Sequence, residues 1–258
     1  MKSYVETFNK HGFFIGKLNK KELHQLNKIR SNIVKITKNF LKIKKINSEK
    51  NFLEKFHKML DNSKKLNECR LNLFNGINKN NFNLNCYNVF SRFIEPIVGN
   101  ENVIQKKINL SIQMPNDDSS LLPVHSDTWA GDSPFEVVMW IPLVNCNKTQ
   151  SMFILPMNSK KYKIFKSKVF KNNNEIMKLI KSDIKFIKIK YGEVLIFSQN
   201  LPHGNVTNLE NKSRFSLNAR IKSLMSPYYK KGLLDFFDIV KLKPATKLGL
   251  NYEFPKFK

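Results

Sequence analysis

Several features that mark membrane, secreted and disulfide-bonded proteins are missing from this sequence of 258 residues. No apolar run approaches the roughly eighteen residues that a membrane-spanning helix needs. The opening segment, MKSYVETFNK, lacks the apolar core of a signal peptide. The three cysteines, Cys69, Cys86 and Cys146, are odd in number and form no CxxC pair, which favours packed, reduced thiols over disulfides or a zinc site. We therefore expect a cytoplasmic protein without a membrane span.

Acidic residues are scarce, with 20 Asp and Glu against 45 Lys and Arg and a net charge of +25. Such an excess can indicate a nucleic-acid or membrane partner. The excess is spread along the chain, however, with 20 basic and 7 acidic residues in positions 1–100 and 25 and 13 in the remainder. Lysine occurs with abundant Asn and Ile, a composition typical of an AT-rich genome. We interpret most lysines as solvated surface residues and expect no specific nucleic-acid partner.

Positive charge is itself absent from one long segment. Between Ile108 and Asn147 the sequence contains no Lys or Arg. Five acidic residues lie in this segment: Asp117, Asp118, Asp127, Asp132 and Glu136. A window of this length without a cation is unexpected in so basic a chain, which indicates local selection against positive charge. A bound cation would exert that selection.

Hydrophobic periodicity divides the chain into a helical part and a strand-rich part. A long amphipathic helix is expected after Asn19, a favourable N-cap with Glu22 three positions on. Further helices are expected at 51–61, 64–76 and 84–97, with Gly76 and the segment from Pro96 to Gly99 as stop signals. Short apolar or alternating runs predict strands at 12–16, 103–114, 135–143, 151–156, 184–190, 193–198 and 213–224.

These elements predict an α+β fold over residues 1–258, organised as a single domain. Residues 1–100 form a mainly helical N-terminal layer, and residues 101–225 form an antiparallel β-core of the sandwich or barrel type. Residues 226–258 form a C-terminal extension. We interpret the lysine-rich segment 158–182 as a surface helical insertion. No internal repeat or linker is evident in the sequence.

The segment without cations contains His125 and Asp127, two positions apart. Side chains at i and i+2 of a strand share a face, so these two could converge on one metal ion. His203 lies 78 residues later, between Pro202 and Gly204, which indicate a tight, shaped loop. Taken singly, each histidine is explained as well by an ordinary loop or turn residue. Together, two histidines and a carboxylate match the facial triad of non-haem Fe(II) oxygenases, which leaves three adjacent metal positions free.

The predicted strand at 213–224 carries a row of polar residues. Arg214, Ser216, Asn218 and Arg220 alternate along it and therefore share one face. Arg214 and Ser216 could grip the distal carboxylate of 2-oxoglutarate, because the guanidinium fork gives a bidentate contact. Arg220 lies about 20 Å further along, which is too far for the same carboxylate. The predicted cofactors are thus Fe(II), with 2-oxoglutarate and O₂ as co-substrates.

Four short motifs bring a family to mind: HSD at 125–127, WIPL at 140–143, GEVLIFSQNLPHG at 192–204 and RFS at 214–216. They resemble the Fe(II)/2-oxoglutarate oxygenases of the phytanoyl-CoA dioxygenase type. The stretches NLSIQMP and SSLLPVHSDTWAGDSPFE resemble most the branch found in bacterial carbohydrate clusters, akin to a streptomycin-cluster protein. The resemblance covers about residues 100–225. It implies a double-stranded β-helix (a cupin-like jelly roll), iron held by His125, Asp127 and His203, and 2-oxoglutarate held by Arg214 and Ser216.

The expected cavity is flanked by polar groups rather than by the broad apolar wall that a fatty-acyl chain needs. We therefore expect a small-molecule substrate, a sugar or sugar nucleotide of surface polysaccharide or glycan biosynthesis, that is hydroxylated or oxidised. Lysines between Lys160 and Lys190 could hold its phosphate groups. The residues predicted to contact substrate are Gln113, Trp129, Asp132, Glu136, Trp140 and Asn218.

Two other functions are compatible with parts of the sequence. A metal-dependent sugar isomerase or epimerase on a cupin-like core would use the metal ligands but not Arg214 and Ser216 as a pair. A nucleic-acid-binding protein would use the lysines, and clustering of lysine with aromatic residues on one face would favour it. The sequence leaves the carbon attacked and the oligomeric state open.

Overall fold

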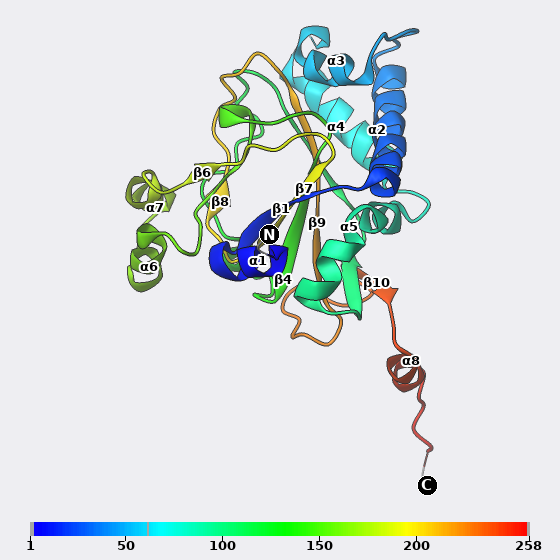
Figure 1. Cartoon of the computed structure of the whole chain (residues 1–258). Helices are drawn as coiled ribbons and strands as arrows, with labels where there is room; N and C mark the ends of the chain where they lie inside the picture. Colours follow the sequence, from blue (N-terminus) through cyan, green and yellow to red (C-terminus); the bar gives the residue numbers. More distant parts are fainter. Residues whose placement is uncertain (1–2, 61, 257–258) are drawn as a thin grey trace.

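The computed structural model describes residues 3–60 and 62–256 and shows a mixed fold of helices and antiparallel sheets (Figure 1). The strands of the larger sheet are β1 (Phe13–Lys17), β2 (Asn102–Gln105), β3 (Asn109–Gln113), β4 (Glu136–Pro142), β7 (Glu193–Ser198), β9 (Arg214–Ser223) and β10 (Phe237–Lys241). Their order is β1-β7-β4-β9-β2-β10, and β3 pairs with β9 beside this path. Strand β9 is central because it pairs with β4, β2 and β3.

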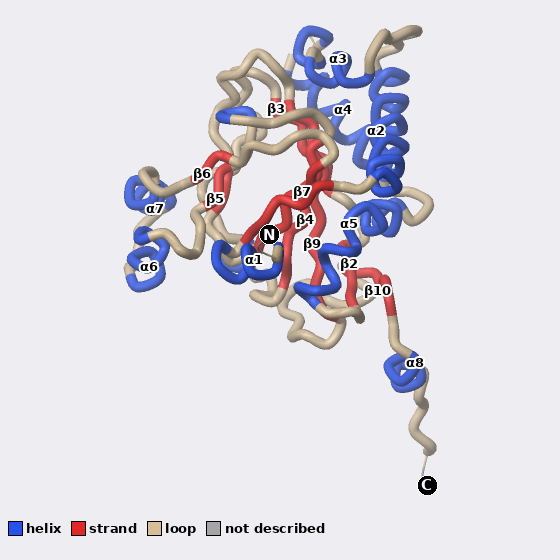
Figure 2. Tube along the Cα trace, in the orientation of Figure 1, coloured by secondary structure: helices blue, strands red, loops and turns tan. Residues whose placement is uncertain are grey.

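A smaller sheet of three short strands is separate from the larger sheet. It comprises β5 (Phe153–Ile154), β6 (Lys185–Phe186) and β8 (His203–Gly204), in the order β6-β5-β8. Figure 2 shows β5 and β6 apart from the central strands. An isolated antiparallel bridge between His125 and His203 attaches the loop that follows β3 to this sheet. The two sheets therefore bring the chain near residue 125 beside strand β8.

Most helices precede the sheets in the chain and cover one side of the larger sheet. The helices are α1 (Tyr4–His11), α2 (Lys20–Phe40), α3 (Glu49–Glu54), α4 (Ser63–Ile77), α5 (Phe82–Val98), α6 (Lys160–Ser167), α7 (Asn173–Ile180) and α8 (Pro244–Leu250). Single 3₁₀ turns are η1 (Phe56–Met59), η2 (Asp127–Ala130) and η3 (Lys148–Gln150). Helix α2 packs on α3, α4 and α5, while α4 contacts β3 and α5 contacts β2 (Figure 1).

The start of α2 shows why local sequence gives this layer. The side chain of Asn19 accepts a hydrogen bond from the Glu22 main-chain N–H at 2.9 Å, and the Glu22 carboxylate accepts one from the Asn19 N–H at 2.7 Å. This capping box satisfies two N–H groups that would otherwise lack partners at the helix start. The apolar face of α2, which includes Leu26, Ile29 and Ile33, is buried against the other helices.

Most of the expected helices and strands are present. The strands expected at 151–156 and 184–190 are only two residues long, as β5 and β6, and the helix expected at 51–61 is divided into α3 and η1, with residue 61 outside the described residues. The strand expected at 103–114 is divided into β2 and β3, because Lys106 N–H donates to the Phe236 carbonyl and Ile108 N–H to the Asn78 side chain instead of to a neighbouring strand. Gly76 lies inside α4 rather than ending it. A Cβ there would be 3.2 Å from Ile36, so glycine permits close approach of α4 to α2.

The two ends of the described chain add structure beyond the expected strands. Residues 4–11 form α1 ahead of β1. Residues 237–241 of the C-terminal extension form β10, which pairs with β2 and places Phe237 opposite Gln105. Helix α6 and helix α7 together occupy the segment expected as a helical insertion, and α8 follows β10 away from the sheets (Figure 1).

One hydrophobic core joins the helical layer to the larger sheet. Phe56 of η1 meets Phe215 of β9 edge-on at 5.0 Å between ring centroids, and every residue of β4 is buried. Cys69, Cys86 and Cys146 are free and buried. Among the described residues, no helix combines the length and the apolar character that crossing a membrane would require.

Strand β1 contacts helix α5 closely at Gly16, so a substitution there tests how tightly the strand and the helix pack. A Cβ on Gly16 would lie 2.6 Å from the ring of Phe93 in α5, so Gly16→Ala forces the ring or the strand to move. We expect a loss of about 1 to 3 kcal/mol in the free energy of unfolding, measured by urea denaturation. Gly249→Ala is the matched control, because no atom lies within 4 Å of the added methyl. Equal stability of both variants would contradict this packing argument.

Candidate active site

The three predicted metal ligands, His125, Asp127 and His203, come together in the structure. Each offers a ligand atom, and these atoms all lie within 4.8 Å of one another. His125 and His203 exchange main-chain hydrogen bonds of 2.9 and 2.8 Å, which holds the loop that carries His125 beside strand β8. Asp127 opens η2, and its N–H donates to the Gln199 carbonyl at 3.2 Å. The geometry therefore places two nitrogens and one carboxylate around a common point.

The hydrogen bonds of the imidazoles determine which ring nitrogen faces that point. His125 Nδ1 lies 2.8 Å from the Pro123 carbonyl, and His203 Nδ1 lies 2.8 Å from the Leu201 carbonyl. A carbonyl only accepts, so both Nδ1 atoms carry a proton, and Nε2 keeps the lone pair wherever the ring is neutral. Burial, with the neighbouring His125, lowers the pKa of His203 to about 4. His203 is therefore neutral near pH 7, as a metal ligand must be.

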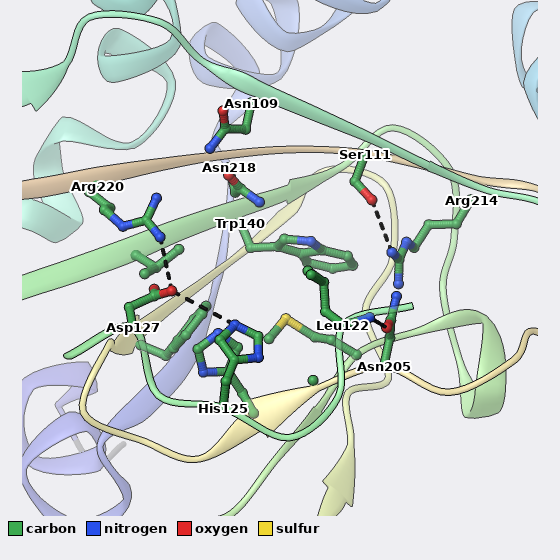
Figure 3. Close-up of a pocket in the computed structure, with 15 residues that line it drawn as sticks. Asn109, Ser111, Leu122, His125, Asp127, Trp140, Asn205, Arg214, Asn218 and Arg220 are labelled. Atoms are coloured by element: carbon green, nitrogen blue, oxygen red, sulfur yellow. Dashed lines mark hydrogen bonds and ion pairs between the residues drawn. The ribbon is translucent and has the colours of Figure 1, made fainter. Parts of the chain in front are cut away.

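These side chains line a cavity of about 310 Å³ (Figure 3). Trp140 of β4 lies in its wall together with apolar groups of Leu122, Met152 and Phe197. Polar lining is supplied largely by amides and one hydroxyl: Asn109, Ser111, Asn205 and Asn218. The donor set and the cavity fit a transition metal held on one side, with open space on the other for ligands.

Arg214 lines the same cavity and is 3% exposed. Its guanidinium donates to the Gln150 carbonyl at 3.3 Å and to Ser111 Oγ at 3.1 Å, and its Nε has no partner. No carboxylate of the described residues forms an ion pair with it, and burial lowers its pKa to about 10. A buried cation without a counter-charge is costly. An anionic ligand in the cavity would remove that cost.

Of two other predicted residues on β9, Asn218 lines the cavity and Ser216 lies outside the lining. Asn218 lines the cavity, and so does Trp140, which pairs with it across β4 and β9. Ser216 is buried next to Arg214 on the same face of the strand, and its Oγ lacks a partner. Ser216 is not among the lining residues, although its unpaired hydroxyl fits a donor for a carboxylate that Arg214 binds.

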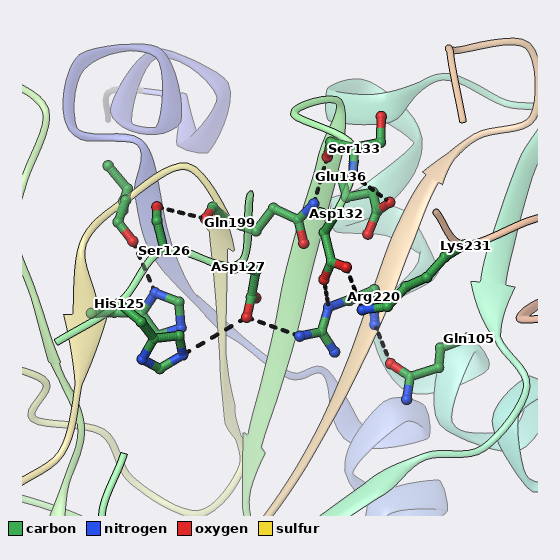
Figure 4. A network of polar contacts seen from close by, with 12 residues as sticks. Gln105, His125, Ser126, Asp127, Asp132, Ser133, Glu136, Gln199, Arg220 and Lys231 are labelled. Carbon is green, nitrogen blue, oxygen red and sulfur yellow. Dashed lines mark hydrogen bonds and ion pairs between the residues drawn. The ribbon is translucent and has the colours of Figure 1, made fainter. Parts of the chain in front are cut away.

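The remaining predicted substrate contacts lie outside the residues that line the cavity. Gln113 is buried and donates to the Val206 carbonyl at 2.6 Å. Trp129 is 47% exposed and packs on Phe165 of α6 at 5.8 Å between ring centroids. Asp132 and Glu136 are buried in a polar cluster behind Asp127 (Figure 4). This placement gives no support to substrate contacts for Gln113, Asp132 and Glu136.

The sequence did not predict that Arg220 contacts Asp127 and Asp132. Its Nη2 donates to Asp127 Oδ1 at 2.9 Å, and its Nε lies 2.7 Å from Asp132 Oδ2. The alternation along β9 had placed Arg220 on the correct face, but a pattern within one strand cannot show which loop passes over that face. Asn205 was also missed: its side chain accepts from the Leu122 N–H at 2.6 Å and donates to the Ser120 carbonyl, which fixes the loop before His125.

Several solved structures resemble the whole arrangement. The nickel complex of the non-heme monooxygenase ThoJ matches with a TM-score of 0.52 at 13% identity, over 93% of this chain and 84% of that chain. HygX from Streptomyces hygroscopicus with nickel and 2-oxoglutarate bound matches with a TM-score of 0.52 at 11% identity, over 92% and 91%. EctD from S. alaskensis with bound Fe matches with a TM-score of 0.51 at 15% identity, over 87% and 77%.

The chain shares the fold of these proteins. The identities are too low for the likeness to carry more than that. No protein-family model and no curated protein matches the sequence. The residues of the cavity therefore have to indicate the function.

Glu136 gives a test of the buried cluster behind the site. Burial, with the nearby charge of Asp132, raises its pKa from 4.5 to about 7. The folded state thus holds this proton more tightly than the unfolded chain does. Protonated Glu136 therefore contributes fully to the free energy of unfolding below pH 4.5, and this contribution is lost as the pH rises through about 7. Glu136→Gln should remove this part of the pH dependence, about 2 to 3 kcal/mol, from urea unfolding measured between pH 4.5 and 8.

The matched control for this measurement is Glu6→Gln, which changes an exposed glutamate in the first turn of α1. It should leave the dependence of stability on pH as it is in the parent protein. If Glu136→Gln showed the parent slope across the same pH range, the raised pKa of Glu136 would be refuted.

Proposed function

We propose that the chain is a non-haem oxygenase that uses Fe(II), 2-oxoglutarate and O₂, and that its two sheets form a double-stranded β-helix within a single domain. One observation carries the proposal. A single cavity holds a His-Asp-His cluster and, across Trp140 from it, a buried arginine without an anionic partner (Figure 3). A metal site alone leaves Arg214 unexplained, whereas a metal chelator with a second carboxylate accounts for both features.

The residues divide the task of binding between them. His125, Asp127 and His203 would hold Fe(II) and leave three adjacent positions free. Arg214 would bind the distal carboxylate of 2-oxoglutarate through its free Nε, with the Ser216 hydroxyl as a second donor. The apolar side chains of the wall, including Met152 and Phe197, would exclude water from the metal side of the cavity. When bound, iron and 2-oxoglutarate would supply the oxidising power for attack on a substrate C–H bond.

Anaerobic titration tests this assignment directly. The parent protein should bind one Fe(II), and 2-oxoglutarate should then produce the weak visible charge-transfer band of the chelate. His125→Ala, Asp127→Ala and His203→Ala should each largely abolish metal binding, because two remaining ligands leave a poorly shaped site. Full metal affinity in all three variants would refute the metal site.

Arg214→Met separates the two binding functions in the same titration. It should bind Fe(II) as the parent does but weaken 2-oxoglutarate binding by about 2 to 5 kcal/mol, at least about 30-fold. Since Arg214 is a buried charge that no described anion balances, the unfolding temperature without 2-oxoglutarate should not fall. Arg92→Gln, which breaks an ion pair in the helical layer, is the control and should leave both affinities unchanged. Unchanged 2-oxoglutarate affinity in Arg214→Met would refute the carboxylate site.

The proposed metal-dependent isomerase alternative is less well supported by these contacts. An isomerase would need the metal ligands but would not use Arg214 and Ser216 as a pair. The buried, partner-free Nε of Arg214 therefore favours the oxygenase.

For the substrate we propose a sugar or sugar nucleotide. The amides of Asn109, Asn205 and Asn218 offer donors and acceptors for hydroxyl groups, and Trp140 offers an apolar face. Such a site disfavours apolar ligands, since they would leave buried polar groups unpaired. Trp129, close to Asp127 in the chain, packs on the lysine-rich helix α6, whose cations could bind phosphate.

A substrate panel tests this part separately. Succinate release should rise with sugar nucleotides or glycolipid precursors and stay at the uncoupled level with acyl-CoA thioesters or free amino acids. Turnover with the second group alone would overturn the carbohydrate assignment and leave the proposed metal and 2-oxoglutarate sites standing. The chelate band described above serves as the control that the site is assembled.

A further inference from the structure

Arg220 is held between two carboxylates, one of which belongs to the candidate metal site (Figure 4). Its Nη2 lies 2.9 Å from Asp127 Oδ1 and its Nε lies 2.7 Å from Asp132 Oδ2. Asp132 also forms an ion pair with Lys231 and is almost completely buried. The Arg220 main-chain N–H donates to Gln105 Oε1 at 3.2 Å, which ties the residue to β2. Arg220 is therefore held at its backbone by a hydrogen bond and at its guanidinium by ion pairs with both carboxylates.

The Asp127 carboxylate has few other restraints. In the described part of the chain, its ion pair is with Arg220, and it also lies 3.8 Å from His125 Nε2. Both contacts are made by the same oxygen, Oδ1, which turns this atom toward the two imidazoles. A carboxylate oxygen has two lone pairs, so a donor on one side leaves the other side available to a metal. Arg220 thus directs Asp127 without blocking it.

Electrostatics alone would make an arginine here unfavourable for metal binding, because a cation next to a ligand repels a metal ion. The charges of this cluster oppose that effect. Asp127 and Asp132 carry two negative charges, and Arg220 and Lys231 carry two positive charges. Because Asp132 neutralises the charge of Arg220 on the side away from Asp127, the repulsion between Arg220 and a metal ion is reduced. The effect of Arg220 on the orientation of the Asp127 carboxylate remains.

We infer that Arg220, braced by Asp132, is a positioning residue that holds the Asp127 carboxylate in its metal-binding orientation. The inference depends on the proposed function, since it requires a metal at His125, Asp127 and His203. Removing such support from a ligand typically weakens metal binding about 10- to 100-fold. Neither residue needs to touch 2-oxoglutarate or substrate for this role.

Cobalt(II) binding to the metal-free protein, followed by its visible spectrum, tests the inference without any need for turnover. Arg220→Gln should weaken cobalt binding about 10- to 100-fold and alter the shape of the spectrum, because Asp127 is no longer held. Arg220→Lys should restore only part of the affinity, since a single ammonium cannot span both carboxylates as the guanidinium fork does. Arg92→Gln, which breaks a different ion pair, should match the parent.

Asp132 provides the second arm of the experiment. Asp132→Asn should weaken cobalt binding less than Arg220→Gln does, and in the Arg220→Gln background it should have no further effect, because it acts through Arg220. The double variant loses one charge of each sign, so it gives the same comparison if Arg220→Gln alone fails to fold.

The outcomes separate this inference from the proposed function. If the parent protein binds no cobalt, the metal site itself fails. If the parent binds cobalt and folded Arg220→Gln or the double variant binds it equally well or more tightly, with the parent spectrum, Arg220 does not position Asp127. Full rescue by Arg220→Lys would show that charge alone suffices and would refute the bracing by the fork.

Discussion

The reciprocal main-chain hydrogen bonds between His125 and His203 hold the candidate site together. These residues are far apart in the sequence, and a loop and a two-residue strand carry them. The pairing works because each imidazole then finds a carbonyl two residues earlier in its own segment, Pro123 or Leu201, to accept its Nδ1 proton. The backbone thus sets the position of both rings and also their tautomer. The side chain of Asp127 has no comparable backbone anchor and depends on a second side chain.

The close approach of these two segments constrains the residue after His203. A Cβ on Gly204 would lie 2.7 Å from the Leu122 carbonyl and 2.9 Å from the ring of Phe153. Any larger residue would push the loop that carries His125 away from β8. Asn205 then binds the same loop through Leu122 N–H and the Ser120 carbonyl. In three consecutive residues, His203 is a candidate metal ligand, Gly204 permits the close approach of the loop, and Asn205 holds that loop by hydrogen bonds.

The sequence predicted the parts of this arrangement that depend on local pattern. Short apolar or alternating runs identified β4, β7 and β9, and the capping residues Asn19 and Glu22 identified the start of α2. The HxD spacing and His203 identified the three groups that converge. The pattern could not predict β10 or the break between β2 and β3, because both depend on hydrogen bonds from distant residues such as Phe236 and Asn78. The pattern also could not show that Asp132 and Glu136 lie outside the cavity lining. Glu136 shares a face of β4 with the lining residues Val138 and Trp140 but belongs to the polar cluster behind Asp127 (Figure 4).

Two arginines on one face of β9 show why the environment decides the role of a residue. Arg214 and Arg220 have the same side chain and the same orientation relative to the strand. Arg220 lines the cavity too, but it has two carboxylate partners, so its charge is already compensated. Among the described residues, the hydrogen-bond acceptors of Arg214 are neutral oxygens, and no carboxylate there compensates its charge. Such a charge lowers the stability of the free protein and at the same time raises the affinity for an anion, because binding removes the desolvation cost. The segment without cations between Ile108 and Asn147 is consistent with the proposed metal site, since an additional lysine near the His-Asp-His cluster would compete with a metal ion for Asp127.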